Sequence, residues 1–309
     1  MTSYPFYDCH YYNSISGYLK LHFGKKVVKL SVDGGFTCPN RDGNLSWDGC
    51  IFCSEKGSGD FSGKRCESIS SQISSQVEAI SRKWPDASYI VYFQNFTNTY
   101  GDIDDLRQKY EEALSYEGVM GLAIATRPDC ISDEVLNLLT EINKKTFLWI
   151  ELGLQTIHEN TAELINRCYK LPVYDNCVKR LNQNGIKVVV HVIVGLPGES
   201  KSDIFETIRY ISSQNIFGLK LQLLHILKGT ALESLFSNRP EIFNFLEFNE
   251  YVNTVVDIIE ILPKDITIHR ITGDAPKELL IEPKWSLNKM NVINNINREF
   301  RKRKSHQGI

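Results

Sequence analysis

Short apolar runs alternate along this chain with longer segments whose apolar residues recur at helical spacing. The run at 27–32 is rich in valine and leucine and suits a buried strand, while segment 67–83 carries isoleucine or valine every three or four residues. The alternation continues to about residue 224, with roughly thirty residues for each strand and its following helix. The expected strands are 27–32, 89–93, 119–125, 147–152, 187–194 and 219–224, and the expected helices are 67–83, 102–115, 132–143, 158–166, 173–184 and 200–213.

Strands that alternate with helices are joined by crossovers and pair in parallel, so the pattern predicts an α/β fold. Six such strands either close toward a barrel or spread into a doubly wound sheet, and in both cases ligands bind beyond the carboxyl ends of the strands. The main unit is expected at 27–228, with an N-terminal extension at 1–26 and a C-terminal extension at 229–309. Within the last extension we expect helices at 248–262 and 286–304 and a short strand at 266–269.

Composition agrees with one large core. With 309 residues, of which 42% are apolar, the chain can fill one α/β barrel of roughly 250 residues. The formal net charge of −2 excludes a uniformly basic nucleic-acid binder, although local patches can attract phosphates. The first thirty residues lack a signal-peptide pattern, and no apolar run approaches about 18 residues. We therefore expect a cytoplasmic protein with reduced thiols and no membrane span.

Three of the eight cysteines, Cys38, Cys50 and Cys53, follow the first expected strand. Three thiolates hold three irons of a four-iron cluster and leave one iron open for a ligand, whereas closed zinc sites and non-catalytic clusters take four protein ligands. The loop lies at the carboxyl end of an early strand, where cofactors act in parallel α/β folds, so a reactive iron–sulfur cluster is favoured. The alternative is a structural zinc loop completed by Cys9, His10 or Cys66, and we interpret Cys66, Cys130, Cys168 and Cys177 as free thiols.

The cysteine loop and three further segments resemble the radical S-adenosylmethionine (SAM) enzymes. These enzymes usually carry Cys-x3-Cys-x2-Cys, whereas eleven residues separate Cys38 from Cys50 here; a subgroup that includes the elongator catalytic subunit tolerates the longer gap. Four segments are similar to the YtqA/YhcC family of that subgroup: Thr37-Cys-Pro-Asn-Arg-Asp-Gly, Phe93-Gln-Asn-Phe-Thr-Asn-Thr-Tyr100, Ala125-Thr-Arg-Pro-Asp129 and Glu151-Leu-Gly-Leu-Gln-Thr156. The resemblance implies a partial (β/α)6 barrel with short N-terminal and helical C-terminal extensions.

The same resemblance implies which residues bind cofactors. The three cysteines, as the catalytic metal ligands, would hold a [4Fe-4S] cluster, and SAM would chelate the fourth iron. For the adenine of SAM, the resemblance implies contacts from Phe52 and from a turn that contains Gly195 and Pro197. It places Gln94, Thr97 and Asn98 near the methionyl amine and Arg167 at the methionyl carboxylate. Glu151 and Gln155 would lie near the ribose or the methionyl group. Packing, capping or helix-end roles are the alternatives for these residues. Further candidates for substrate contact are Tyr100, Arg127, Asp129 and His225.

The resemblance also implies a function. The enzyme would cleave SAM reductively to a 5′-deoxyadenosyl radical, with a reductant such as flavodoxin or ferredoxin. Because the elongator subunit acts on the wobble uridine of tRNA, and YtqA-type relatives are assigned to maturation of its side chain, the implied substrate is tRNA. A carboxymethylaminomethyl group at carbon 5 would become aminomethyl. The alternatives are a small metabolite, a porphyrin-like substrate, or a non-catalytic iron–sulfur carrier. A basic cluster at 298–304 is interpreted as a solvated helix end, with phosphate binding as its alternative.

Overall fold

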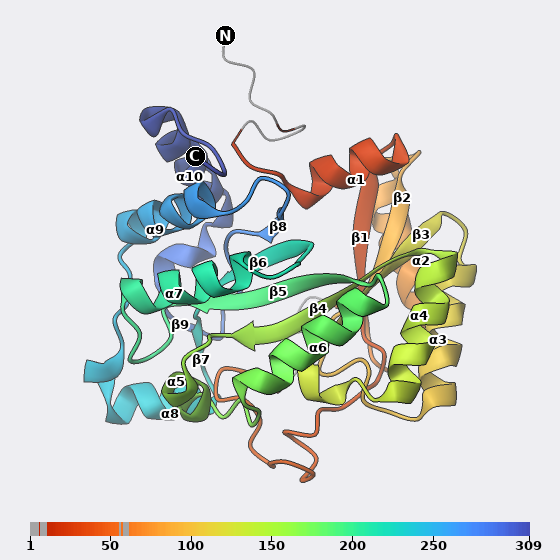
Figure 1. The fold of residues 1–309 in the computed structure, drawn as a ribbon, viewed down its shortest axis with the longest axis horizontal. Coiled ribbons are helices and arrows are strands. Elements are labelled where there is room, and N and C mark those ends of the chain that lie inside the picture. The colour runs from red at the N-terminus through yellow and green to blue at the C-terminus, as the bar shows by residue number, and fades with distance from the viewer. Residues whose placement is uncertain (1–5, 7–10, 56, 58–61) are drawn as a thin grey trace.

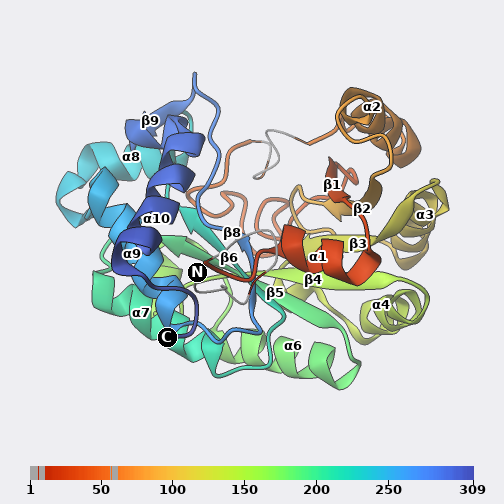
Figure 2. The same ribbon diagram turned by 90° about the horizontal axis from the view of Figure 1, so that it is seen from above.

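The computed structural model describes residues 6, 11–55, 57 and 62–309. Its centre is a sheet of seven parallel strands in the order β1-β2-β3-β4-β5-β6-β8. The strands are β1 (Val27–Val32), β2 (Ser88–Phe93), β3 (Val119–Thr126), β4 (Phe147–Gln155), β5 (Lys187–Val194), β6 (Gly218–Leu223) and β8 (Thr267–Arg270). The sheet curls into a half-barrel, which Figure 2 shows from one end.

Helices cover the convex face of this sheet, as Figure 1 shows. They are α2 (Ile69–Ser81), α3 (Ile103–Ser115), α4 (Asp133–Lys145), α5 (Glu159–Leu164), α6 (Leu171–Gln183), α7 (Lys201–Ser212) and α9 (Phe248–Ile261). Most begin at a side chain that accepts a hydrogen bond from the first turn, such as Ser132 for α4 and Ser200 for α7. The predicted α/β fold and its six β-strands are confirmed, and the predicted helix at 158–166 is shorter than expected.

The strand β8 is the main difference from the expected six-strand barrel. The prediction placed 266–269 in a C-terminal extension, but this segment pairs in parallel with β6 as the seventh strand. Gly218 makes the close pairing possible, because a Cβ there would lie 2.6 Å from the ring of His269. Four residues give too short a pattern to reveal membership of a sheet.

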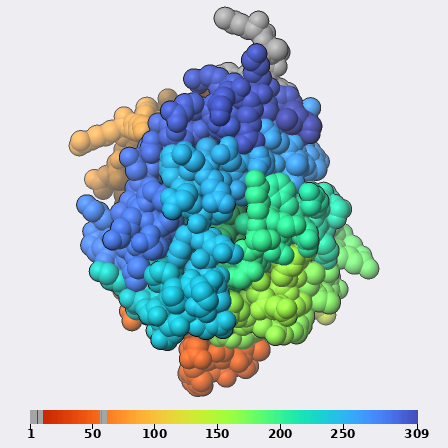
Figure 3. Space-filling view, turned by 90° about the vertical axis from the view of Figure 1, so that its left-hand side faces the viewer, coloured from red at the N-terminus to blue at the C-terminus, as the bar shows by residue number. Residues whose placement is uncertain are grey.

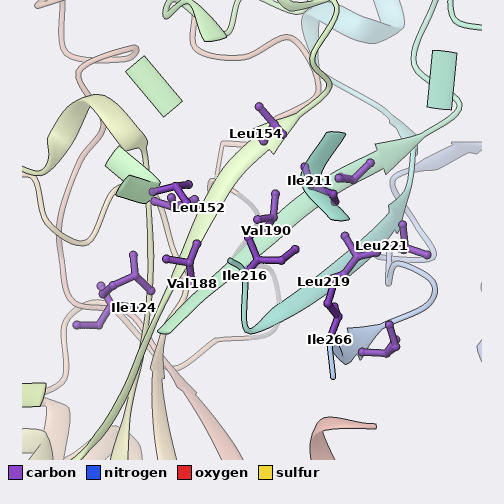
Figure 4. Close-up of a cluster of buried hydrophobic side chains, with 14 of the residues drawn as sticks. Ile124, Leu152, Leu154, Val188, Val190, Ile211, Ile216, Leu219, Leu221 and Ile266 are labelled. Carbon is purple, nitrogen blue, oxygen red and sulfur yellow. The ribbon is translucent and has the colours of Figure 1, made fainter. Parts of the chain in front are cut away.

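Apolar side chains from the convex face of the sheet and from the helices form the main core. Figure 4 shows part of it, in which Ile124, Leu152 and Val190 from the strands pack with Ile211 and Ile216. These side chains are buried. Strands that are buried in a parallel sheet have few polar interruptions, which is why the strand segments stand out in the sequence.

A second apolar cluster closes the amino end of the half-barrel. The helix α1 (Ile15–Phe23) supplies Leu19, which packs with Val27, Ile90, Trp149 and Val189 on the concave face of the sheet. The chain just before α1 also joins the edge of the sheet, because the Ile268 N–H donates to the carbonyl of Asn13 at 2.7 Å. Water therefore enters the half-barrel from the carboxyl end of the strands rather than from this end.

The C-terminal segments form much of the face shown in Figure 3, in cyan to dark blue. They include α8 (Ala231–Asn238), α10 (Lys289–Arg303) and a small antiparallel pair, β7 (Ile226–Leu227) with β9 (Leu280–Glu282). Phe300 of α10 is buried and stacks on Tyr11. In the basic cluster at 298–304, Arg303 makes ion pairs with Asp257, Glu260 and Glu299. Among the described residues, every helix is too short or too polar to cross a membrane.

Candidate functional site

A cavity of about 520 Å³ opens at the carboxyl end of the parallel strands. Its wall comes from the cysteine loop after β1, from the ends of β2 to β6, and from β8. This is the edge of the sheet where the sequence predicts ligand binding. Clefts of this size commonly hold one cofactor and the reacting part of a substrate.

All three predicted cluster ligands, Cys38, Cys50 and Cys53, line this cavity as half-buried cysteines outside any disulfide. Asn40 fixes their loop, because its side-chain amide donates to the carbonyl of Asn166 at 2.6 Å and to the Cys50 sulfur at 3.5 Å. Arg41 donates to the Cys53 carbonyl at 2.8 Å. These bonds fix the shape of the loop and connect it to the turn at Asn166.

The donor set fits an open four-iron cluster better than a zinc ion. A closed zinc site takes four protein ligands, and within the described part of the chain Cys38, Cys50 and Cys53 are the only cysteines that line the cavity. The proposed fourth zinc ligand Cys66 is exposed and does not line the cavity, while Cys9 and His10 lie outside the described residues.

The neighbouring thiol and burial affect the ionisation of Cys50. A hydrogen bond to Cys53, together with burial, raises the pKa of Cys50 well above its usual value. Arg127 lies close enough to interact with Cys38 and Cys50, and it is held by Asp129 through two bonds of 2.9 and 2.7 Å. Binding of a metal cluster would displace the thiol protons, and the nearby guanidinium would stabilise the resulting thiolates.

Several predicted cofactor-binding residues lie in the same cavity wall. They are Phe52, Gln94, Thr97, Glu151, Gln155 and Arg167. Gln155 ends β4 with φ of +71°, an uncommon conformation for a residue with a side chain, and its buried amide oxygen has no hydrogen-bond partner among the described groups. Strain and an unsatisfied polar atom at a cavity wall are the combination expected where a ligand donates a hydrogen bond.

Arg167 contributes to this geometry through the main chain. Its buried guanidinium donates to the carbonyls of Leu154, Thr156 and Tyr169 at 2.6 to 3.1 Å. Two of those carbonyls flank Gln155, so Arg167 supports the strained end of β4. Its predicted contact with a methionyl carboxylate stays a prediction.

The structure does not bring every predicted residue to the cavity. Within the described part of the chain, Asn98, Gly195 and Pro197 do not line it. Asn98 is buried and donates to the carbonyls of Phe93 and Ala125, so it ties β2 to β3. Gly195 has φ of +91° in the turn after β5. Of the candidate substrate contacts, Arg127 and His225 line the cavity, whereas Tyr100 and Asp129 do not.

A buried charged layer lies beneath this rim, and of its members only Glu151 was expected from the sequence. Glu151 is fully buried and accepts hydrogen bonds from Lys220 at 2.7 Å, His191 at 2.8 Å and the Trp149 ring at 3.0 Å. Lys29 lies 3.5 Å from the same carboxylate. These side chains come from four strands. The sequence feature that could have identified them is a polar residue at an inward position of an otherwise apolar strand, as in Gly-Leu-Lys-Leu-Gln-Leu of β6.

The charged layer shifts the ionisation of its members. Burial alone would raise the pKa of Glu151, but Lys220, Lys29 and His191 hold it well below its usual value. Burial lowers the pKa of Lys220 to about 7, against the opposing pull of Glu151. Burial and the Lys220 charge lower the pKa of His191 to about 4, so this ring is neutral at pH 7.

Comparisons with known proteins agree with this architecture. The model of the Radical SAM superfamily matches residues 37–211, and that of the Radical_SAM C-terminal domain matches residues 216–302. YtqA of Bacillus subtilis is 45% identical over 96% of this chain and 92% of its own length. YhcC of Escherichia coli K12 is 36% identical over 90% of this chain and 88% of its own length.

More distant matches extend the comparison. A tRNA uridine(34) acetyltransferase of Methanocaldococcus infernus is 25% identical over 57% of this chain, which spans 32% of that protein. The solved structure of Elp3 from the same archaeon, with an N-terminal deletion, superimposes with a TM-score of 0.68 at 17% identity and covers 91% of this chain and 64% of the other. At that identity the likeness shows the fold alone, and it confirms the predicted half-barrel.

Proposed function

The chain belongs to the radical SAM superfamily and is an enzyme that uses a [4Fe-4S] cluster and SAM; we propose that it modifies the wobble uridine of tRNA. In this proposal a carboxymethylaminomethyl group at carbon 5 of the base becomes aminomethyl. A balanced conversion consumes SAM and water and releases methionine, 5′-deoxyadenosine, glyoxylate and one proton. The carbon–nitrogen bond to the carboxymethyl portion breaks, and no net electron is consumed.

The residues that would hold the cluster are Cys38, Cys50 and Cys53, on the ligand count described above and their place in one cavity wall. When bound, the cluster supplies the electron that cleaves SAM to the hydrogen-abstracting 5′-deoxyadenosyl radical. Around it, the chain contributes binding and exclusion of water. We propose that Phe52, Gln94, Thr97 and Gln155 contact SAM, since all four line the cavity. Glu151 and Arg167 also line it, but they are engaged by Lys220 and His191 and by main-chain carbonyls. These two residues, together with Asn98, Gly195 and Pro197, would then act indirectly, by shaping the cavity wall.

The size of the cavity supports a small reacting group. About 520 Å³ must hold SAM together with the part of the substrate that loses hydrogen. The proposed reacting group, the side chain at carbon 5 of one base, is small and can share such a cavity with SAM. The buried polar side chains of the interior, such as Glu151 and Lys220, also suit a charged group better than an apolar ring.

An exposed aromatic residue supports an RNA substrate. Trp47, in the loop between the first two cysteines, has 76% of its surface exposed, and Leu45 beside it is also exposed. An exposed indole is a stacking surface for an unpaired base, and single-stranded loops such as an anticodon are recognised in this way. The name of the Methanocaldococcus infernus relative, which refers to tRNA uridine 34, points to the same substrate class.

The observation that carries the proposal is the cavity that joins the three cysteines to a charged interior. The test is mass spectrometry of tRNA nucleosides from a deletion strain. Carboxymethylaminomethyluridine should accumulate while the aminomethyl derivatives disappear, and a copy of the wild-type gene should restore them. A Cys50→Ala copy is the matched control and should not. An unchanged nucleoside profile in the deletion strain would contradict the proposal.

The proposal includes a reductant such as flavodoxin or ferredoxin. With either protein and SAM, the anaerobically reconstituted enzyme should release 5′-deoxyadenosine and glyoxylate in equal amounts from tRNA that carries the carboxymethylaminomethyl group. Release of 5′-deoxyadenosine without glyoxylate would show a radical enzyme with a different substrate. This measurement also separates an enzyme from an iron–sulfur carrier, which would release neither product.

A further inference from the structure

The inner end of the cavity is formed by charged and polar side chains, which we call the charged floor: Glu151, His191, Lys220, Gln222 and Arg270. They project from β4, β5, β6 and β8. Lys220 precedes the end of β6 by three residues, which places it about 10 Å along the strand from the rim. The cysteines lie beyond the rim, in the loop after β1. A group that reaches the floor is therefore well separated from the cluster and from the end of SAM that chelates it.

The charge of the floor depends on pH, because burial lowers the pKa of Lys220 to about 7. Its cations and their neighbours are Lys29, Lys220 and Arg270, and the carboxylates that face them are Glu151 and Asp274. Asp274 is shared with Lys289, an outer cation, at 2.6 Å. The nearby rings of His191 and His225 are neutral at pH 7, since burial lowers the pKa of each to about 4. An anion beside Lys220 would stabilise the charged form of this lysine in a region of low dielectric.

The floor also holds hydrogen-bonding groups that are available to a ligand. Two of the three N–H groups of Lys220 donate to Tyr92 and Glu151, both at 2.7 Å, and the third is available to a molecule in the cavity. The buried Nε2 atom of His225 has no hydrogen-bond partner among the described groups. Glu151, by contrast, already accepts from Trp149, His191 and Lys220. Lys220 can thus bind a ligand, while Glu151 orients it.

We propose that the charged floor binds the carboxylate of the substrate, with Lys220 and Arg270 as its binding residues and Glu151 as the positioning residue of Lys220. The proposal rests on the proposed function, in which the side chain to be shortened ends in a carboxylate. With the carboxylate on the floor, the carbon next to the amine would lie between the floor and SAM. A substrate without the carboxylate would lack this anchor.

Lys29 offers a matched control. It faces the same Glu151 carboxylate at 3.5 Å and stacks on the same Tyr92 ring as Lys220, but it does not line the cavity. Replacing either lysine by methionine removes one cationic group beside Glu151 at similar volume. Lys220 is closer to the carboxylate, at 2.7 Å against 3.5 Å, and is more buried, so Lys220→Met should cost more stability. A ligand-binding role of Lys220 predicts in addition that only Lys220→Met changes the preference for a substrate with a carboxylate.

The experiment measures the binding of two anticodon stem-loop RNAs to the reconstituted enzyme with SAM and without reductant, so that no turnover occurs. One RNA carries carboxymethylaminomethyl at the wobble uridine, and the other carries methylaminomethyl, which keeps the amine but lacks the carboxylate. Wild-type enzyme should bind the first RNA at least about tenfold more tightly, as expected for charge-assisted hydrogen bonds. Lys220→Met should abolish this preference, and Lys29→Met should retain it.

Three results would overturn the inference: equal binding of the two RNAs by the wild type, a preference that survives in Lys220→Met, or its equal loss in Lys29→Met. If Lys220→Met does not fold, Arg270→Gln, at a half-buried position, serves as the second variant and should reduce the preference. The nucleoside profile of the deletion strain tests the proposed function separately. A changed profile together with equal RNA binding would sink the inference and leave the proposed function standing.

Proton uptake gives a second readout. The groups that face Lys220 are Lys29 of β1, Tyr92 of β2, Glu151 of β4, His191 of β5, and His269 and Arg270 of β8. A carboxylate placed beside Lys220 would raise its pKa from about 7, so binding at pH 7.5 should take up protons. Titration calorimetry of the wild type should give a binding enthalpy in phosphate buffer that differs from the one in Tris buffer. Lys29→Met should show the same difference between the two buffers. Equal enthalpies for the wild type in the two buffers would contradict the inference.

Discussion

Replacement of Glu151 by glutamine tests whether the interior charges depend on this one carboxylate. The carboxylate is fully buried and receives bonds from Lys220, His191 and Trp149 at 2.7, 2.8 and 3.0 Å. Glutamine has the same shape, but it removes the negative charge and turns one acceptor oxygen into an N–H donor that faces other donors. Lys220 and Lys29 would then lose their shared counterion in an interior of low dielectric.

The magnitude follows from the burial of the pair. Removing one partner of a buried ion pair costs about 3–5 kcal/mol, a large share of the roughly 5–15 kcal/mol that stabilises a typical domain. A second change, Lys220→Met, removes a cation that Glu151→Gln leaves unpaired. The double variant should therefore be more stable than the sum of the two single losses predicts, by about 1–3 kcal/mol.

The assay is urea unfolding of the protein without its cluster, followed by circular dichroism. Glu141→Gln is the matched control, because Glu141 pairs with Arg107 at 2.8 Å on the exposed side of α4 and should contribute far less. The reasoning is refuted if Glu151→Gln loses no more stability than this control. It is also refuted if the losses in the double variant are simply additive.

Three further predictions concern the cysteine loop, the sheet and the pH dependence of stability. Asn40→Leu removes the donor 3.5 Å from the Cys50 sulfur and should lower the reduction potential of the bound cluster in an electron paramagnetic resonance titration; an unchanged potential would contradict this. Gly121→Ala should lower the free energy of unfolding by at least about 1–3 kcal/mol in thermal unfolding, because the added Cβ would lie 2.0 Å from the carbonyl oxygen of Phe147. A variant as stable as the wild type would show that the strands shift freely. The wild type should lose stability in urea titrations as pH falls from 6.5 through 4. Burial lowers the pKa of His191 from 6.5 to about 4, so the unfolded chain binds more protons than the folded chain in this range. A free energy of unfolding that does not change over this range would count against this.

The rim of the site could be predicted from sequence because it depends on local signals. The spacing of Cys38, Cys50 and Cys53 is visible in the chain, and parallel strands place the segments that follow them at one edge. Gln94 and Gln155, from two such segments, do line the cavity with the cysteines. Family membership, fold and cofactors were therefore predicted correctly from these segments.

The remainder depends on contacts that the sequence does not show. Asn98 and Arg167 have the polarity of ligand-binding residues, but their donors are satisfied by main-chain carbonyls whose positions follow from the folded turns. Lys220 and Lys29 are far apart in the chain and meet near Glu151 only because the sheet curls. A polar residue within an apolar strand indicates on which face of the sheet its side chain lies. It does not identify the side chains from other strands that it contacts across the half-barrel.

The order of layers along the half-barrel explains why the charged floor is better understood as a binding site than as a stabilising core. Just below it, Leu19, Val27 and Trp149 fill the concave side with apolar contacts, so this chain can close its interior without charges. A buried ion pair stabilises a protein no better than apolar residues of similar volume, and it carries a desolvation cost. The apolar layer also keeps water away from Glu151 and Lys220, which strengthens every interaction that they make. Charges kept at such a cost, between an apolar layer and the cysteine rim, are explained by a charged group of the substrate that must be held at this depth.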